Sequence, residues 1–420
     1  MDRLLIRGGR RIEGSVQIRG AKNAALPQIA AALLGSGRLE LTNVPEVTDV
    51  DTMLALMQEF GVVATRGTGR TLVLDASGAR SAQAPYDMVR RMRAGILVLA
   101  PLLARFGSAR VSMPGGCAIG ARPIDLHLKA LDALGAEVNI ESGYINARVK
   151  EGGLRGGRVV LSSPSIGATE TALMAATLAR GETEILNAAR DPEVSDLVLT
   201  LAAMGARIAG EGTHRILVQG VEALHNARHD LITDRIEAGT YAIAAAITGG
   251  HLEILGAHLE HLGSVGAILE SAGVQIWPSD RGLMVVRSRP LQGIDITTEP
   301  YPGFPTDLQA QFMALMTIAL GASVVRETIY ESRVMHVPEL NRLGANIALQ
   351  GSTALVRGVE KLHGAEVMAT DLRASVSLVL AALVAEGETT VHRIYHLDRG
   401  YEALDRKLVQ CGADIQRVAG

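Results

Sequence analysis

The sequence predicts an α/β fold of two domains in which buried helices are surrounded by sheets. Three observations support this prediction. The chain has 420 residues, which is too long for one ordinary core. One structural unit recurs six times, and each copy contains a helix that is apolar nearly all round. The residues are 48% hydrophobic with only 3% aromatics and 46 glycines, so we expect cores of small aliphatic side chains joined by tight turns.

The repeated unit is an apolar residue, three further positions, a glycine and then a β-like segment. The glycines are 74, 70, 68, 71 and 68 residues apart, and the copies occupy residues 57–61, 131–135, 201–205, 269–273, 340–344 and 408–412. A single copy is typical of any helix that ends at a glycine with positive φ. Six copies at nearly constant spacing indicate a true repeat, with three units in each domain as the simplest division.

A second, more apolar helix precedes each copy and is followed by a short strand. These helices are expected within 25–37, 95–107, 169–181, 239–250, 309–321 and 375–387. A helix that is apolar nearly all round is usually buried, whereas a helix with one polar face lies at the surface. The pattern therefore predicts core helices covered by sheets.

Composition argues against several classes of protein. The net charge of -3 gives no electrostatic reason to expect nucleic-acid binding. No apolar stretch has the length of a signal peptide or a membrane span, so we expect a cytoplasmic protein. Cys117 and Cys411 fit no metal or disulfide pattern and are predicted to be reduced thiols.

The first candidate for chemistry is the segment GAKNAALP at residues 20–27. Lys22 and Asn23 stand where a helix begins, and a cation, an amide and the helix dipole together favour an anion such as phosphate or carboxylate. The segment lacks the GK[ST] of a P-loop. The alternative is that Asn23 only caps the helix and Lys22 is solvated.

The second candidate is the glycine-rich loop MPGGCAIGARPIDLH at residues 113–127. Arg122 in this loop could lower the pKa of the Cys117 thiol or bind an anion, and such a thiol can act as general acid or nucleophile. The alternative is an inert cysteine in a turn. Cys411 precedes the last repeat glycine and is predicted to be a packing residue.

The third candidate is EPYPGFPTDLQAQF at residues 299–312, where a proline-rich segment leads into an apolar helix. Thr306 or Asp307 is expected in the first turn of this helix. A carboxylate there is commonly a helix cap, but the same rigid position suits a general base for a hydroxyl group. Arginines also recur at comparable edges of the units, where several could bind one anionic substrate or could form only surface ion pairs: Arg93, Arg333, Arg373 and Arg399.

Taken together, these segments resemble the enolpyruvyl transferases, and in particular the branch that acts on UDP-N-acetylglucosamine in peptidoglycan synthesis. The resemblance extends over essentially the whole chain and includes PGGCAIGARPIDLH, GATET, AARDPE, DRIEAGT, FPTDLQAQF, ESRVMHVPEL, MATDLRAS and RIYHLDRGYE. It implies two inside-out α/β barrel domains with a cleft between them. The first would hold residues 22–231, and the second residues 1–21 plus 232–420.

The resemblance also implies roles for individual residues. Cys117 would protonate the methylene carbon of phosphoenolpyruvate and could form a covalent adduct with it, and Asp307 would take the proton of the sugar 3′-hydroxyl. Lys22 would be catalytic and would also bind phosphoenolpyruvate, together with Asn23, Arg122, Arg333, Arg373 and Arg399. UDP-N-acetylglucosamine would contact Arg93, Arg122, Pro123, Ile124, Asp125, Leu126, Ser163, Ser165, Ile166, Gly167, Asp307 and Ile329. No metal and no organic cofactor is expected.

The implied reaction transfers the enolpyruvyl group to the 3′-hydroxyl of UDP-N-acetylglucosamine with release of phosphate. One departure concerns Ser163, which stands where the family often has a lysine near the nucleotide phosphates. Two alternatives remain open: a sister transferase that acts on shikimate 3-phosphate, and a degenerate paralogue that only binds a UDP-sugar. Cys117 favours the sugar-nucleotide branch over the first, and the presence of Cys117, Asp307 and Lys22 disfavours the second. A monomer is expected rather than a stable oligomer.

Overall fold

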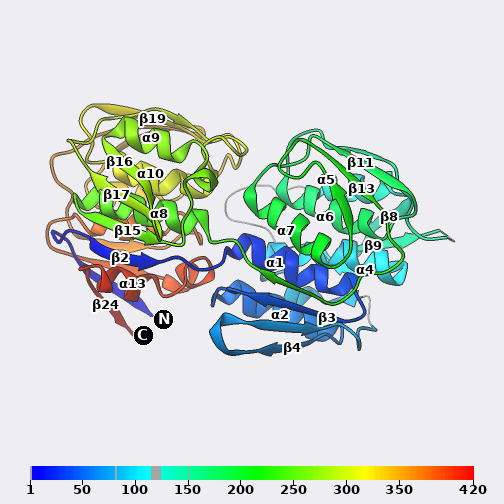
Figure 1. The fold of residues 1–420 in the computed structure, drawn as a ribbon. Helices are drawn as coiled ribbons and strands as arrows, with labels where there is room; N and C mark the ends of the chain where they lie inside the picture. Colours follow the sequence, from blue (N-terminus) through cyan, green and yellow to red (C-terminus); the bar gives the residue numbers. More distant parts are fainter. Residues whose placement is uncertain (1, 81–82, 115–123, 151) are drawn as a thin grey trace. The chain divides into compact units, whose positions relative to one another are not determined.

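The computed structural model describes residues 2–80, 83–114, 124–150 and 152–420, which form two compact units (Figure 1). Among the described residues, the first unit contains 2–19 and 233–420. The second unit contains 20–80, 83–114, 124–150 and 152–232. Each unit has a hydrophobic core of its own.

The second unit contains three four-stranded sheets among its described residues, in the orders β14-β3-β5-β4, β6-β7-β9-β8 and β10-β11-β13-β12. The strands are β3 (Arg38–Thr42), β4 (Val63–Arg66), β5 (Leu72–Asp75), β6 (Gln83–Ala84), β7 (Ser108–Ser112), β8 (Ala136–Glu141), β9 (Tyr144–Val149), β10 (Arg158–Val160), β11 (Glu182–Leu186), β12 (Arg207–Ala209), β13 (Arg215–Gln219) and β14 (Ala227–Asp230). The helices are α1 (Lys22–Ala31), α2 (Thr48–Glu59), α3 (Tyr86–Val89), α4 (Leu99–Phe106), α5 (Asp125–Ala133), α6 (Ile166–Thr177) and α7 (Pro192–Ala203).

The first unit repeats this arrangement with sheets ordered β2-β15-β17-β16, β18-β19-β21-β20 and β22-β23-β1-β24. Its strands are β1 (Arg3–Arg7), β2 (Glu13–Gln17), β15 (His251–Leu255), β16 (Val274–Ser279), β17 (Gly282–Arg287), β18 (Ile296–Thr297), β19 (Ala322–Arg326), β20 (Asn346–Gln350), β21 (Thr353–Arg357), β22 (Glu366–Met368), β23 (Glu388–His392) and β24 (Asp414–Val418). Its helices are α8 (Arg235–Thr248), α9 (Val265–Ala272), α10 (Gln309–Met316), α11 (Val337–Arg342), α12 (Val376–Ala382) and α13 (Leu404–Gln410).

The predicted repeat is confirmed by the backbone. Each repeat glycine follows a helix, precedes a strand and has a positive φ, a conformation that glycine adopts without steric cost: Gly61, Gly135, Gly205, Gly273, Gly344 and Gly412. In every sheet the first pair of strands is parallel and the other two pairs are antiparallel. The copies therefore share topology as well as sequence.

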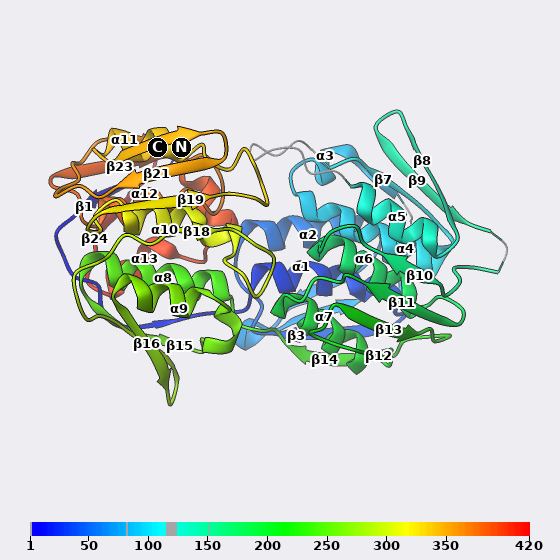
Figure 2. The same cartoon turned by 90° about the horizontal axis from the view of Figure 1, so that it is seen from above.

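The predicted layering is also confirmed, because the apolar helices lie inside each unit and the sheets lie outside them (Figures 1 and 2). All residues of α10 and α12 are buried, as are all residues of α1 except Asn23. The helices that end at the repeat glycines bury only one face; α2, for example, buries Val50, Met53 and Met57 but leaves Glu59 exposed.

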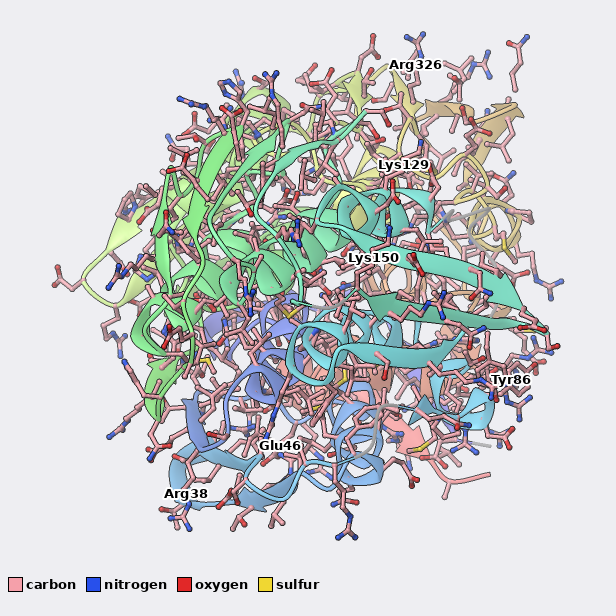
Figure 3. The ribbon with its side chains drawn as sticks, turned by 90° about the vertical axis from the view of Figure 1, so that its right-hand side faces the viewer. Arg38, Glu46, Tyr86, Lys129, Lys150 and Arg326 are labelled. Carbon is pink, nitrogen blue, oxygen red and sulfur yellow. The ribbon has the colours of Figure 1, made fainter. Side chains whose placement is uncertain are left out.

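The sheets are not built only from strands of one repeat. Strand β14 pairs with β3, which lies nearly 190 residues earlier, and β1 lies between β23 and β24. Charged side chains such as Arg38 and Lys150 stand on the outer surface of the second unit (Figure 3). No helix among the described residues is long and apolar enough to cross a membrane.

Candidate active site

Lys22 begins helix α1, but its side chain is not solvated. Lys22 is 7% exposed, and its Nζ lies 3.3 Å from Oδ2 of Asp49 on α2, which is 4% exposed. Asn23 is not the N-cap, because Ala21 holds that position and no side chain caps the helix. The alternative of a cap and a solvated lysine is therefore wrong. A helix N-terminus with a buried cation beside it is suited to an anion.

Three of the segments predicted to contact the UDP-sugar converge on His127, a residue of α5 that the sequence did not single out. The Nδ1 atom of His127 lies 2.8 Å from Oγ1 of Thr171 on α6. A Cβ atom added to Gly167 would lie 2.9 Å from Cε1 of His127, so the ring packs directly on the start of α6. His127 thereby joins the helix that begins at Asp125 to the helix that begins at Ile166.

The charge state of His127 reflects the same surroundings. Burial and, to a lesser extent, the positive charge of Arg93 lower the pKa of His127 to about 4, while Asp125 opposes the shift. The imidazole is therefore neutral near pH 7, and Arg93 lies close enough to influence it. His127 is 8% exposed.

The remaining predicted contacts of this unit are described in part. Ser165 is the N-cap of α6, and its hydroxyl accepts a hydrogen bond of 3.3 Å from the Ala168 amide. Ile124 is buried, Leu126 and Gly167 are half-buried, and Asp125, Ser163 and Ile166 are exposed. Cys117, Arg122 and Pro123 lie outside the described residues.

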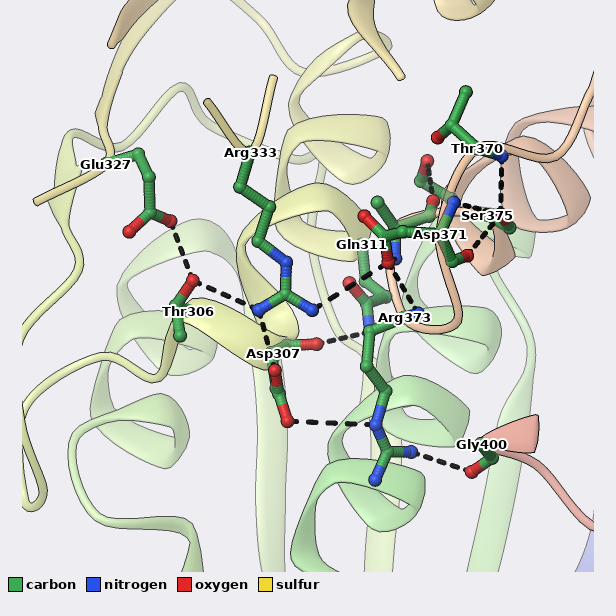
Figure 4. Close-up of polar contacts among 12 residues, drawn as sticks. Thr306, Asp307, Gln311, Glu327, Arg333, Thr370, Asp371, Arg373, Ser375 and Gly400 are labelled. Carbon is green, nitrogen blue, oxygen red and sulfur yellow. Dashed lines mark hydrogen bonds and ion pairs between the residues drawn. The ribbon is translucent and has the colours of Figure 1, made fainter. Parts of the chain in front are cut away.

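Asp307 lies in the first unit, in a 3₁₀ turn from Thr306 to Leu308 that leads into α10. Its Oδ1 accepts a hydrogen bond of 2.6 Å from Nη1 of Arg333, and its Oδ2 lies 3.7 Å from Nε of Arg373 (Figure 4). No side chain caps this turn, so the alternative of a helix cap is wrong. The Asp307 side chain is 23% exposed, which leaves part of the carboxylate accessible between two buried cations.

Arg333 is held between two carboxylates. Its Nη1 also donates to Oγ1 of Thr306 at 3.1 Å, and its Nη2 lies 3.8 Å from Oδ1 of Asp371. Burial alone would lower the pKa of Arg333, but Asp307 and Asp371 raise it above its usual value. The guanidinium is therefore permanently charged and fixed beside Asp307.

Glu327 joins Asp307 to the segment of Ile329, and sequence reasoning missed it. The buried Glu327 carboxylate accepts hydrogen bonds from Oγ1 of Thr298 at 2.8 Å and Oγ1 of Thr306 at 2.9 Å. It also accepts from the backbone amides of Ile329 at 2.8 Å and Tyr330 at 2.9 Å. The four hydrogen bonds replace the water that a carboxylate would bind at the surface. Glu327 therefore holds the Thr306 turn and the Ile329 segment in fixed positions.

Arg373 is 1% exposed and makes its contacts inside the unit. Its Nη2 donates to Oδ2 of Asp234 at 3.1 Å, and its Nη1 donates to the carbonyl of Gly400 at 2.8 Å. Burial opposes its charge, but Asp234, Tyr401 and Asp307 raise the pKa of Arg373 above its usual value. Gly400 directly follows Arg399, a half-buried residue at the end of a 3₁₀ helix. The predicted anion ligands Arg333 and Arg373 are thus both directed at carboxylates.

The described residues contain no group of three or more His, Cys, Asp or Glu side chains arranged to hold a metal ion. The polar side chains around Asp307 are paired with one another in the manner just described. The chemistry that this arrangement supplies is a carboxylate of fixed orientation beside fixed positive charge.

The family model of EPSP synthase (3-phosphoshikimate 1-carboxyvinyltransferase) matches residues 6–408. The chain is 69% identical over 419 residues to the UDP-N-acetylglucosamine 1-carboxyvinyltransferase 2 of Mesorhizobium japonicum, covering 100% of both chains. It is 58% identical over 420 residues to the UDP-N-acetylglucosamine 1-carboxyvinyltransferase of Gluconacetobacter diazotrophicus, again with 100% coverage of both.

Solved structures agree with this relationship. The enolpyruvyl transferase NikO of Streptomyces tendae superposes with a TM-score of 0.89 at 28% identity over 99% of each chain. An EPSP synthase of Acinetobacter baumannii superposes with a TM-score of 0.76 at 19% identity over 100% of each chain, which shows the common fold. The full-length family match and the high identity to the curated relatives show that this chain belongs to the enolpyruvyl transferase family.

Proposed function

We propose that the protein transfers the enolpyruvyl group of phosphoenolpyruvate to the 3′-hydroxyl of UDP-N-acetylglucosamine and releases phosphate. The relatives that share 58% to 69% of its residues are named UDP-N-acetylglucosamine 1-carboxyvinyltransferases, which supports the acceptor and the group transferred. The observation that carries the proposal is the Asp307 carboxylate, part exposed and fixed 2.6 Å from the buried Arg333. A base that must remove a hydroxyl proton needs such a rigid, accessible position.

The reaction proceeds by addition and elimination. The 3′-oxygen attacks carbon 2 of phosphoenolpyruvate while Asp307 accepts the hydroxyl proton and the Cys117 thiol donates a proton to the methylene carbon. Loss of a proton from the resulting methyl group then restores the double bond as phosphate leaves. Cations around the phosphate stabilise the charge that develops in both steps.

Lys22, Asn23, Arg122 and Arg399 are assigned to phosphoenolpyruvate. The buried position of Lys22 at the start of α1 supports its place in this set, because a desolvated ammonium attracts an anion more strongly than a solvated one. Arg333 and Arg373 are assigned to the orientation of Asp307, since their guanidinium groups already contact carboxylates.

The UDP-sugar is assigned to the segments near His127, together with Asp307 and Ile329. The described residues of these segments are Arg93, Ile124, Asp125, Leu126, Ser163, Ser165, Ile166 and Gly167. Arg122 and Pro123, which lie outside the described residues, are assigned to the same ligand. Ser165 at the N-terminus of α6 supports a phosphate or uracil contact, because backbone amides at a helix start are donors without a partner inside the helix. We extend the proposal to a monomer that acts in the cytoplasm on two small-molecule substrates.

The test is phosphate release from phosphoenolpyruvate with UDP-N-acetylglucosamine, with shikimate 3-phosphate, and without acceptor. We expect release only with the sugar nucleotide, and a fall in kcat of about 10²- to 10⁴-fold for Asp307→Asn and Cys117→Ala. An exposed carboxylate supplies the control Asp280→Asn, which should retain full activity. Release with shikimate 3-phosphate would favour the sister transferase, and binding of the sugar nucleotide without release would favour a binding protein.

A further inference from the structure

A buried polar cluster in the first unit contacts the backbone of Asp307. It consists of Thr240 on α8, Gln311 on α10 and Tyr401, which follows the 3₁₀ helix of Arg399. All three are at most 2% exposed. The proposed reaction assigns no role to these side chains, although each belongs to a segment that resembles the family. Burying polar groups costs free energy, so three buried polar side chains beside the proposed base indicate a structural or functional role.

The protons in this cluster can be assigned from the distances. The Thr240 hydroxyl donates to the carbonyl of Ile236 at 2.8 Å, so its single proton is already used. Its oxygen lies 3.1 Å from the Tyr401 hydroxyl, which must therefore be the donor of that hydrogen bond. Burial raises the pKa of Tyr401 to about 12, so the phenol keeps this proton at physiological pH.

Gln311 connects the phenol to the base. Its Nε2 donates one proton to the backbone carbonyl of Asp307 at 2.7 Å, and its second proton faces the Tyr401 oxygen at 3.1 Å and the Thr240 oxygen at 3.3 Å. The opposite orientation of the amide would place two oxygens against each other at the Asp307 carbonyl, which excludes it. The Tyr401 hydroxyl, as the nearer of these two acceptors and itself bonded to Thr240, therefore helps to fix the side chain that holds the backbone of Asp307.

The Tyr401 ring is also linked to the carboxylate of Asp307, through Arg373. The guanidinium of Arg373 lies 5.1 Å from the centre of the ring, within the range of a cation–π contact. The Nε of Arg373 makes no hydrogen bond and faces Oδ2 of Asp307 at 3.7 Å. The hydroxyl and the ring of one residue thus support the backbone and the carboxylate of the same aspartate.

We propose that Tyr401 is a positioning residue for Asp307, acting through Gln311 on its backbone and through Arg373 on its carboxylate. The inference rests on the proposed function of Asp307 as the base. Because Tyr401 acts on Asp307 through Gln311 and Arg373, its loss should disturb the orientation of the base more than the binding of either substrate. Misplacement of a catalytic group by about 1 Å can reduce a rate about 100-fold.

The experiment is a double-mutant cycle on kcat with Tyr401→Phe and Asp307→Asn. Tyr401→Phe removes the hydroxyl and keeps the ring, and we expect kcat to fall about 10- to 100-fold while both KM values stay within about threefold. In the Asp307→Asn background the same substitution should have little further effect, because residues that act as a unit are not additive. Tyr395→Phe, at an exposed tyrosine of the preceding 3₁₀ helix, is the matched control and should leave kcat unchanged.

Several outcomes would overturn the inference. A multiplicative effect of Tyr401→Phe in the Asp307→Asn background would mean that the tyrosine acts independently of the base, as a purely structural residue does. An unchanged kcat in Tyr401→Phe would remove it from the mechanism while leaving the proposed function intact. A wild-type protein without sugar-nucleotide-dependent release would instead remove the proposed function itself. If Tyr401→Phe does not fold, Gln311→Met tests the same link, since it removes the donor to the Asp307 carbonyl at similar volume.

Discussion

The ammonium group of Lys22 lies 3.3 Å from the carboxylate of Asp49, and both side chains are more than nine-tenths buried. An ion pair of this kind costs much to desolvate and depends on both partners being present. The proposed anion ligand therefore has its charge stabilised by the protein before any substrate binds.

This relationship predicts the effect of Asp49→Asn. The substitution leaves a buried cation without the opposite charge at 3.3 Å, and we expect the free energy of unfolding to fall by about 3 kcal/mol. Urea unfolding followed by circular dichroism measures the change. Asp51→Asn on the same helix removes an exposed carboxylate and should change stability by less than about 1 kcal/mol. Equal effects of the two variants would contradict the importance of the buried pair.

The contact between Gly167 and His127 predicts a steric effect on sugar-nucleotide binding. A Cβ atom at Gly167 would lie 2.9 Å from Cε1 and 3.1 Å from Nε2 of the buried imidazole, so Gly167→Ala must displace the start of α6 or the ring. We expect KM for UDP-N-acetylglucosamine to rise about tenfold, which is about 1.4 kcal/mol. His127→Ala in the same chain should relieve the collision, so the double variant should bind better than the two single effects combined predict. Simple addition of the two effects would show that the contact is not the cause.

The four hydrogen bonds to Glu327 predict a structural role for this carboxylate. Glu327→Gln keeps the shape but replaces one acceptor oxygen by a donor, so at least one of the hydrogen bonds from Thr298, Thr306 or the Ile329 and Tyr330 amides is lost. We expect the free energy of unfolding to fall by about 1–3 kcal/mol and kcat to fall because Thr306 precedes Asp307. Thermal unfolding and phosphate release check the two effects. Glu299→Gln, at an exposed glutamate before the same turn, should change neither.

Glu237 predicts how stability depends on pH. Burial raises the pKa of Glu237 to about 7, with Lys407 at 2.6 Å opposing the shift and Asp234 adding to it. Between pH 4.5, the ordinary pKa of a glutamate, and about pH 7, Glu237 keeps a proton in the folded protein that it releases in the unfolded chain. The stabilisation that Glu237 contributes is therefore fully present below pH 4.5 and is lost as the pH rises to about 7. Urea unfolding from pH 5 to 8 should show a fall in stability with rising pH that is absent in Glu237→Gln. A parallel dependence in both proteins would assign the effect to another group.

Much of the fold could be predicted from the sequence, because local signals determine it. The glycine after each helix must have a positive φ, and Gly61 and Gly412 show this at the two ends of the repeat array. Helix α12 is apolar on every side and is accordingly buried on every side. The pairing of β1 with β23 joins Leu4 to Val391 and has no local signal, and the resemblance to the family implied only that residues 1–21 belong with residues 232–420.

The candidate site could be predicted only where chemistry and local position coincide. Asp307 follows a proline-rich segment at the start of an apolar helix, and this context is visible in the sequence. Asp49 is an ordinary acidic residue in the first turn of an amphipathic helix, and only the packing of α2 on α1 gives it a role. Arg333 and Arg373 were recognised as cations, but their partners Asp371 and Asp234 are long-range neighbours that spacing does not reveal.

The position of β1 between β23 and β24 also bears on how the protein is made. The described residues of the second unit all lie between 20 and 232, so this unit can assemble while the ribosome is still translating the rest of the chain. Strand β1 is synthesised well before its partner strands, because Arg7 pairs with Glu388 and Arg3 pairs with Val418. At ordinary rates of translation this delay is on the order of tens of seconds, during which an apolar strand has no partner. During this interval the unpaired edges of β1 are open to chaperone binding and to pairing with strands of other chains.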